Sequence, residues 1–241
     1  MRKEFFKPDP AVRKKLYIIY LLSIHLLLIG LLYSCVLFRR PSIEKTIDRT
    51  SLYYHRHVKY HLRATGNWPD GSFIFIGDSH IEGLCGSAVA NPAVNLGIGK
   101  DTIAGSIARI DQYQNLSKAK CIILSIGSND LNRQSIIQMI EEMTILIKHL
   151  PEKVPFICCG LFPTYDTLGD RNKKARLFNQ EMVKLCHEYC TGSFIDIYDS
   201  LLDEQGRVNK QYYDADGIHL NSNGNAIWIK ALRNQLAEHG A

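Results

Sequence analysis

The chain has 241 residues, of which 46% are hydrophobic and 22% charged, so its composition is that of a folded globular protein and excludes a disordered chain. This length fits one domain with appended segments, or at most two small domains. The net charge of +5 is concentrated near the N-terminus, at Arg2, Lys3, Lys7, Arg13, Lys14, Lys15, Arg39 and Arg40. The remainder is slightly acidic, which argues against a nucleic-acid-binding surface on the globular part.

A basic tail over residues 1–15 precedes an apolar segment, Leu16–Phe38, that contains no Asp, Glu, Lys or Arg. The segment is long enough for a transmembrane helix, which needs about 20 apolar residues, and longer than most signal-peptide cores. We therefore expect a transmembrane anchor over residues 16–38. The excess of Lys and Arg before the segment mildly favours a cytoplasmic N-terminus and an exported domain. A buried core helix and a lipoprotein signal with a lipidated Cys35 are the alternatives.

The seven cysteines cannot all pair within one chain, and free thiols argue weakly against export to an oxidising compartment. Cys121, Cys158 and Cys159 lie in apolar runs typical of buried strands. Cys186 and Cys190 have helical spacing, but a metal site would need two further ligands at suitable spacing. We therefore expect no metal.

Residues 39–71 are polar and compatible with a helix, which indicates a stem or flanking helix. Its histidines His55, His57 and His61 are most simply interpreted as a solvated face.

From residue 72 onward, short apolar runs alternate with segments of helical periodicity. The expected strands are FIFIG, AVNLG, CIILSIG, FICCG and SFIDI, and the expected helices are Ile103–Tyr113, Ser135–Leu150, Arg171–Tyr189 and Asn223–Leu236. This alternation predicts parallel βαβ units with a sheet covered on both faces.

In an open parallel sheet the functional site lies beyond the carboxyl ends of the strands. The residues there are Gly77-Asp78-Ser79, Gly97-Ile98-Gly99 and Gly127-Ser128-Asn129-Asp130. A serine on a strand-to-helix turn can act as a nucleophile if a base takes its proton. A Gly-Asp-Ser triplet alone is equally compatible with helix capping.

Further candidates strengthen the catalytic interpretation of Ser79. A backbone N–H at Gly97 and the side-chain amide of Asn129 could stabilise an oxyanion. Asp216 and His219 precede the last helix, three residues apart, so the carboxylate can orient the imidazole if the loop turns back. Asp214 is a rival for the role of the acid.

These four blocks, ending in Asp216-Gly217-Ile218-His219, resemble the SGNH hydrolase superfamily, also called the GDSL-like lipase/acylhydrolase family. The resemblance covers residues 72–237, and the hydrolase domain that it implies spans residues 72–241. It implies a flavodoxin-like three-layer α/β/α sandwich with five parallel strands. It also implies Ser79 as nucleophile, Asp216 and His219 as acid and base, and an oxyanion hole of Ser79, Gly97 and Asn129, with no metal or organic cofactor.

Other residues near these blocks receive secondary roles. His80, Pro163, Thr164 and Tyr165 are candidate substrate contacts, while Asp78, Asn95 and Asp130 are interpreted as structural. Four basic residues could attract an anionic substrate, although a solvated helix start is the simpler interpretation of them. These residues are Arg171, Lys173, Lys174 and Arg176.

The sequence therefore predicts a membrane-anchored serine esterase that hydrolyses carboxylic esters of a small molecule, lipid or glycan through an acyl-serine intermediate. One alternative is an O-acyltransferase that acts on envelope glycans with the same residues. The other is a non-catalytic binding module that kept the fold. The expected partners are the ester substrate and a membrane, and no nucleic acid.

Overall fold

The computed structural model describes residues 9–37, 52–165, 170–189 and 191–238 of the chain. By contacts it divides into two units, Met1–Lys45 and Thr46–Ala241, which are described separately.

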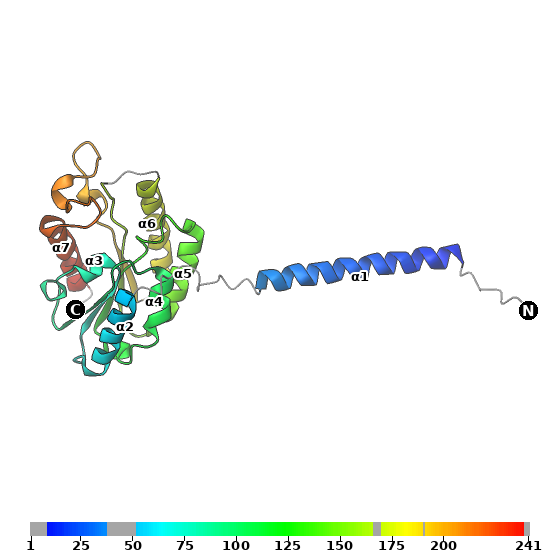
Figure 1. Ribbon diagram of the computed structural model, residues 1–241, viewed down its shortest axis with the longest axis horizontal. Helices are drawn as coiled ribbons and strands as arrows, with labels where there is room; N and C mark the ends of the chain where they lie inside the picture. Colours follow the sequence, from blue (N-terminus) through cyan, green and yellow to red (C-terminus); the bar gives the residue numbers. More distant parts are fainter. Residues whose placement is uncertain (1–8, 38–51, 166–169, 190, 239–241) are drawn as a thin grey trace, which may run out of the picture. The chain divides into compact units, whose positions relative to one another are not determined.

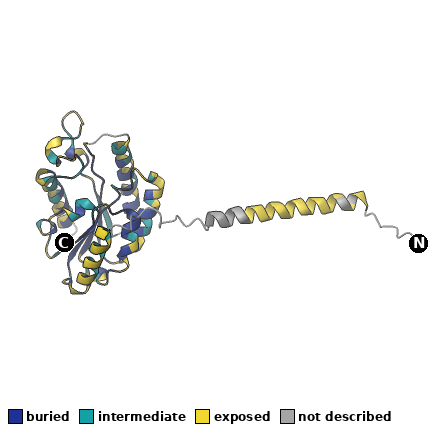
Figure 2. Ribbon diagram, viewed as in Figure 1, coloured by how far each residue is buried: buried dark blue, intermediate teal, exposed yellow. Residues whose placement is uncertain are grey.

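The first unit contains one long helix, α1 (Pro10–Leu37), whose described apolar side chains are mostly exposed (Figure 2). Within the part of the chain whose side chains the structure describes, no helix combines the length and apolar character needed to cross a membrane. The transmembrane segment expected over Leu16–Phe38 extends beyond that part, because the side chains of residues 31–38 lie outside the described residues.

The second unit is built on a five-stranded sheet with the order β2-β1-β3-β4-β5, in which every pair is parallel. The strands are β1 (Phe73–Gly77), β2 (Ala93–Gly97), β3 (Cys121–Ser125), β4 (Phe156–Cys159) and β5 (Gly192–Ile195). This is the flavodoxin-like order, with its switch point where β1 lies between β2 and β3. The five expected strands and the parallel sheet are confirmed.

Helices cover both faces of the sheet and make the three layers visible in Figure 1. The helices are α3 (Ser79–Glu82), α4 (Ile103–Ile110), α5 (Ile136–Lys148), α6 (Arg171–His187) and α7 (Ser222–Glu238). Alternate residues of each strand enter two separate cores. Ile74 and Ile76 of β1 pack with α4, α5 and α6, whereas Phe73 and Phe75 pack with α3 and α7.

Helix α2 (Leu52–Ala64) belongs to this unit and packs against it. The Tyr54 hydroxyl donates to the Gly105 carbonyl of α4 at 3.1 Å, and Leu62 contacts the core. The interpretation of its histidines as a solvated face is wrong for two of them. His57 Nε2 lies 3.7 Å from Glu82 Oε1, and His61 Nδ1 lies 3.3 Å from the Tyr113 hydroxyl.

Candidate active site

Ser79 begins α3 directly after β1, at the carboxyl edge of the sheet. Gly77 is needed at the strand end, because a Cβ there would collide with the Ser125 carbonyl oxygen. Asp78 caps the turn by accepting the His80 N–H at 3.0 Å. The turn thereby holds the Ser79 hydroxyl beyond the sheet, where a base can reach it.

His219 and Ser79 are brought together from opposite ends of the unit. His219 Nε2 lies 2.8 Å from Ser79 Oγ, and His219 Nδ1 lies 2.6 Å from Asp216 Oδ2. The other carboxylate oxygen of Asp216 accepts the N–H groups of Ile218 at 2.9 Å and His219 at 3.0 Å. Partial burial would raise the pKa of Asp216, but these hydrogen bonds outweigh it and lower the pKa to about 2. The Asp216 carboxylate therefore stays ionised at any pH at which an imidazole side chain ordinarily gains or loses its proton.

Asp214, the rival acid, is engaged in the backbone of the same loop. Its N–H donates to the His219 carbonyl at 2.9 Å, and its carbonyl accepts the Gly217 N–H at 3.0 Å. The hydrogen-bond partners of the His219 ring are Asp216 Oδ2, which accepts from Nδ1, and Ser79 Oγ at Nε2.

A cavity of about 1040 Å³ opens beside Ser79 and His219. Most of its described lining residues have polar side chains, and Ile218 is the only aliphatic side chain among them. The lining residues are Tyr53, Tyr54, Ser79, Glu82, Gly83, Gly99, Lys100, Asp101, Thr102, Ser128, Asn129, Asn132, Arg133, Thr164, Arg171, Ile218 and His219.

Gly97 does not occupy the oxyanion position expected for it. Its N–H donates to Asn95 Oδ1 at 2.9 Å, and the residue is not part of the cavity wall. A Cβ at this position would collide with the backbone of Glu82. The glycine is therefore required for close packing of β2 against the nucleophile turn, and Asn95 supports this packing through bonds to the carbonyls of Ile81 at 2.6 Å and Leu84 at 3.0 Å.

Asn129 does line the cavity, together with Ser79. Its side-chain Nδ2 donates to the Asp101 carbonyl at 2.9 Å, which orients the amide. An asparagine amide carries two donors, so one N–H can hold this carbonyl while the second meets a ligand.

Of the four expected substrate contacts, only Thr164 lines the cavity. Tyr165 lines a different cavity, and the Lys210 ammonium lies 4.2 Å from the centroid of the Tyr165 ring. Pro163 accepts the Tyr213 hydroxyl at 2.6 Å through its carbonyl. The His80 ring packs against the rings of Phe162 and His219, with centroids 5.0 Å and 5.4 Å apart.

Burial sets the protonation of the ionisable groups beside the nucleophile. Burial, together with the charges of His219 and Arg171, lowers the pKa of His80 to about 3, so its imidazole is neutral at physiological pH. Burial also raises the pKa of Asp78 to about 7, against the hydrogen bond from the His80 N–H.

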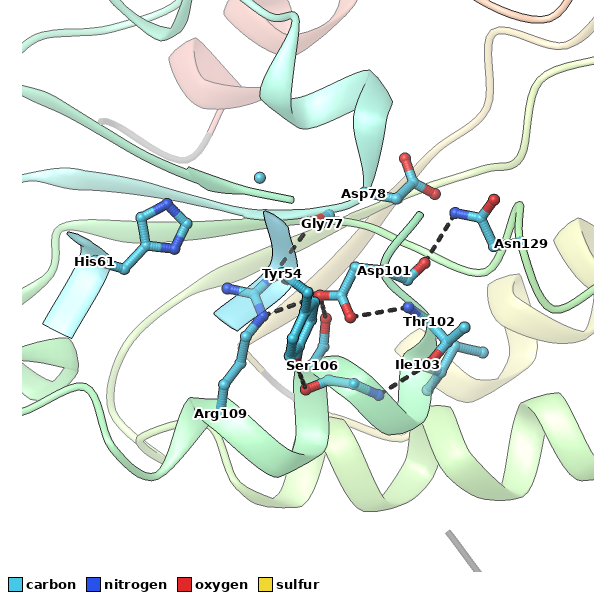
Figure 3. Close-up of polar contacts among 12 residues, drawn as sticks. Tyr54, His61, Gly77, Asp78, Asp101, Thr102, Ile103, Ser106, Arg109 and Asn129 are labelled. Atoms are coloured by element: carbon cyan, nitrogen blue, oxygen red, sulfur yellow. Dashed lines mark hydrogen bonds and ion pairs between the residues drawn. The ribbon is translucent and has the colours of Figure 1, made fainter. Parts of the chain in front are cut away.

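A buried ion pair supports the loop between β2 and α4 (Figure 3). Arg109 Nη2 and Nε each lie 2.9 Å from Asp101 Oδ2, which also accepts the Ser106 hydroxyl at 3.1 Å. The guanidinium further donates to the Gly77 carbonyl at 3.3 Å, two residues before Ser79. Burial alone would lower the pKa of Arg109, but the charge of Asp101 outweighs it and raises the pKa above its usual value. The pair therefore links the nucleophile turn to the segment that bonds Asn129.

Sequence reasoning missed several residues of the cavity wall, namely Tyr53, Glu82, Lys100 and Arg133. The Tyr53 hydroxyl donates to the Glu82 carboxylate, so α2 forms part of the wall. Lys100 could have been found, because it directly follows the Gly97-Ile98-Gly99 strand end. Among the described residues, no cluster of His, Cys, Asp and Glu is arranged to hold a metal ion.

A family model described as "GDSL-like Lipase/Acylhydrolase family" matches residues 75–227. No curated protein sequence matches the chain.

Solved structures share the fold. A GDSL-like lipase from Bacteroides thetaiotaomicron aligns with a TM-score of 0.66 and 15% identity, over 76% of this chain and 98% of that one. A lipase/acylhydrolase from Enterococcus faecalis aligns with a TM-score of 0.58 and 16% identity, over 70% and 96%. An acetylxylan esterase from Geobacillus stearothermophilus aligns with a TM-score of 0.56 and 16% identity, over 68% and 93%. At these identities the likeness concerns the fold alone.

Proposed function

Because the chain belongs to the GDSL-like lipase/acylhydrolase family, we propose that it is a serine esterase with Ser79 as its nucleophile. The observation that carries the proposal is the hydrogen-bonded series from Ser79 Oγ through His219 to Asp216, with distances of 2.8 Å and 2.6 Å, at the wall of the cavity.

The geometry supports a two-step reaction. His219 Nε2 takes the proton of Ser79 as the hydroxyl attacks the acyl carbon, and Asp216 stabilises the imidazolium that forms. His219 then protonates the leaving alcohol, and water attacks the acyl-serine with the same base. The Ser79 N–H and the side-chain amide of Asn129 are the proposed donors to the oxyanion.

The cavity wall favours esters with short acyl chains and polar alcohols. Burial of each methylene gains about 0.8 kcal/mol only where it leaves water for an apolar surface, and Ile218 is the only aliphatic side chain among the described residues of the wall. A long acyl chain therefore gains little here, whereas hydroxyl-rich alcohols meet tyrosine, asparagine and threonine side chains. We propose acetyl or similarly short esters of such alcohols, including glycans, as the substrates.

A panel of 4-nitrophenyl esters from acetyl to palmitoyl tests this proposal on the detergent-solubilised full chain. We expect kcat/KM for the acetyl ester to exceed that for the octanoyl ester by about tenfold, since the described part of the wall offers a longer chain a single aliphatic side chain. A rise in kcat/KM with chain length would contradict it. Adding glycans as acceptors and measuring acylated glycan against free acid separates hydrolysis from the alternative, O-acyltransferase activity.

We further propose that Leu16–Phe38 anchors the domain in a membrane, with the N-terminus cytoplasmic and the catalytic domain exported. Leu16–Gly30 carries no charged side chain and its residues are exposed, while Lys14 and Lys15 precede it. Extraction of membranes with alkaline carbonate should leave the full chain in the pellet and release a variant lacking residues 1–51. Release of the full chain would refute the anchor, and protease protection of the domain in intact cells would refute its export.

A further inference from the structure

Basic side chains from separate segments meet in the cavity wall beside Ser79. Lys100 follows β2, Arg133 follows β3, and Arg171 begins α6. The wall also contains two acidic residues, but both face other partners. Asp101 is fully buried against Arg109, and Glu82 accepts the Tyr53 hydroxyl and lies 3.7 Å from His57 Nε2. Basic side chains therefore outnumber acidic ones among the described residues of the wall, and Lys100 is exposed there.

Lys100 is held in an unusual backbone conformation. Its φ is 65°, and it is the single non-glycine residue with positive φ in the described part of the chain. This left-handed conformation is unfavourable for a residue with a Cβ, and such residues persist where surrounding structure holds them and often where they have a function.

The neighbours of Lys100 supply that support. The Asp101 N–H donates to the Ile98 carbonyl at 3.0 Å, and the Asp101 carboxylate is fixed by Arg109 (Figure 3). The turn thus places an exposed ammonium group at the cavity in a position where glycine would fit without strain.

Arg171 is fixed on another side of the same cavity. Its Nη2 donates to the carbonyl of Ser128 at 2.9 Å and to the Ser128 hydroxyl at 2.8 Å, next to Asn129. The positive charge of Arg171 also contributes to the lowered pKa of His80, after burial and His219, so its field reaches the nucleophile turn. The solvated helix start suggested by the sequence is therefore wrong for Arg171, whereas Lys173 is exposed and outside the cavity wall.

We propose that this cavity selects esters that carry a negatively charged group, a carboxylate or a phosphate, which Lys100 and Arg171 bind beside the scissile bond. This inference rests on the proposed esterase function and names a substrate class for it. The charged group takes no part in bond making, so its contribution is to binding and orientation of the ester.

Two matched pairs of esters test the selectivity. 4-Acetoxybenzoate and its methyl ester differ in charge on the alcohol side, and 4-nitrophenyl hemisuccinate and 4-nitrophenyl butyrate differ in charge on the acyl side. For each pair, the ratio of kcat/KM for the anionic ester to that for the neutral ester is measured in the full chain and in its variants. Comparison of ratios between variants cancels the intrinsic reactivity of the esters.

We expect Lys100→Gln to lower the ratio about fivefold in at least one pair, because it removes an exposed charge and keeps a polar side chain only one bond shorter. Arg171→Gln should lower it about tenfold or more, and Arg171→Lys should retain part of the preference. The matched control Lys173→Gln removes a charge from the same helix outside the cavity and should leave the ratio unchanged. Raising the ionic strength should lower the ratio of the unaltered chain.

The inference is overturned if neither ratio falls in Lys100→Gln and Arg171→Gln, or if Lys173→Gln lowers the ratio as much as they do. Hydrolysis of the neutral esters reports that each variant is folded. The esterase function itself would be refuted if the unaltered chain did not hydrolyse the neutral esters, or if Ser79→Ala still hydrolysed them. Neutral esters hydrolysed through Ser79 without any charge preference would refute this inference alone.

Discussion

Replacing Ser79 by Ala is expected to lower kcat/KM for a short-chain ester by about 10⁴-fold or more, because it removes the hydroxyl that is hydrogen-bonded to His219 Nε2. His219→Ala should lower it by a similar factor, and the double variant should be little worse than either single one, because the two residues act as a unit. Initial rates with 4-nitrophenyl acetate measure the effect, and a fluorophosphonate probe should label the unaltered chain but not Ser79→Ala.

Matched controls lie near the same site. Ser87 is an exposed serine in the segment after α3, and Ser87→Ala should retain activity within about twofold. Asp216→Asn should lower kcat by about 10²–10⁴-fold through loss of imidazole orientation. Asp214→Asn should cost far less, because Asp214 interacts through its backbone. Full activity of Ser79→Ala, or equal losses in the two Asp variants, would contradict the assignment.

Arg109→Met is expected to destabilise the domain by about 3–5 kcal/mol, because it leaves the Asp101 carboxylate buried without its counter-charge. Arg109 and Asp101 have side-chain exposures of 1% and 0%, and water cannot replace the lost bonds. For a domain of this size the loss corresponds to a fall in Tm of roughly 6–20 °C, measurable by thermal or urea unfolding.

Arg176→Met is the matched control for this prediction. Arg176 pairs with Asp199 at 2.6 Å, but the two side chains are 46% and 78% exposed, so the loss should stay below about 1 kcal/mol. Combining Arg109→Met with Asp101→Leu should restore part of the stability, since no buried charge remains. Equal Tm changes for Arg109→Met and Arg176→Met would show that the buried pair is not the cause.

The sheet could be predicted because each strand is a continuous apolar run that ends in turn residues. β1 and β3 are buried on both faces, so their sequences are continuous apolar runs. The short length of these runs distinguishes them from helices. The placement of Ser79 and Asn129 followed from the rule that strand ends meet at one edge, whereas His219 was assigned from its spacing to Asp216 and from the family resemblance.

The error at Gly97 has a different origin. Sequence position showed that β2 ends near the site, but not which N–H groups after it face the cavity. The side chain of Asn95 takes the Gly97 N–H, and the chain reaches the cavity only from Gly99 onward. The same limit applies after β4, where Thr164 lines one cavity and its neighbour Tyr165 another.

The role of α2 could not be predicted, because it depends on contacts between residues far apart in sequence. Tyr53 meets Glu82, and Tyr54 meets Gly105, across long stretches of chain. A polar segment after an apolar one is most simply interpreted as a stem, and only the folded unit shows that it closes one side of the site.

The cavity wall combines residues from inside and from outside the segment that the family model matches. Ser79, Asn129 and His219 lie within residues 75–227, the part matched by the family model, whereas Tyr53 and Tyr54 lie before it. Mutations in α2 can therefore reshape what the cavity admits while the reacting groups stay intact. Divergence of substrate preference among related enzymes can thus begin in a segment that comparisons of the shared domain leave out.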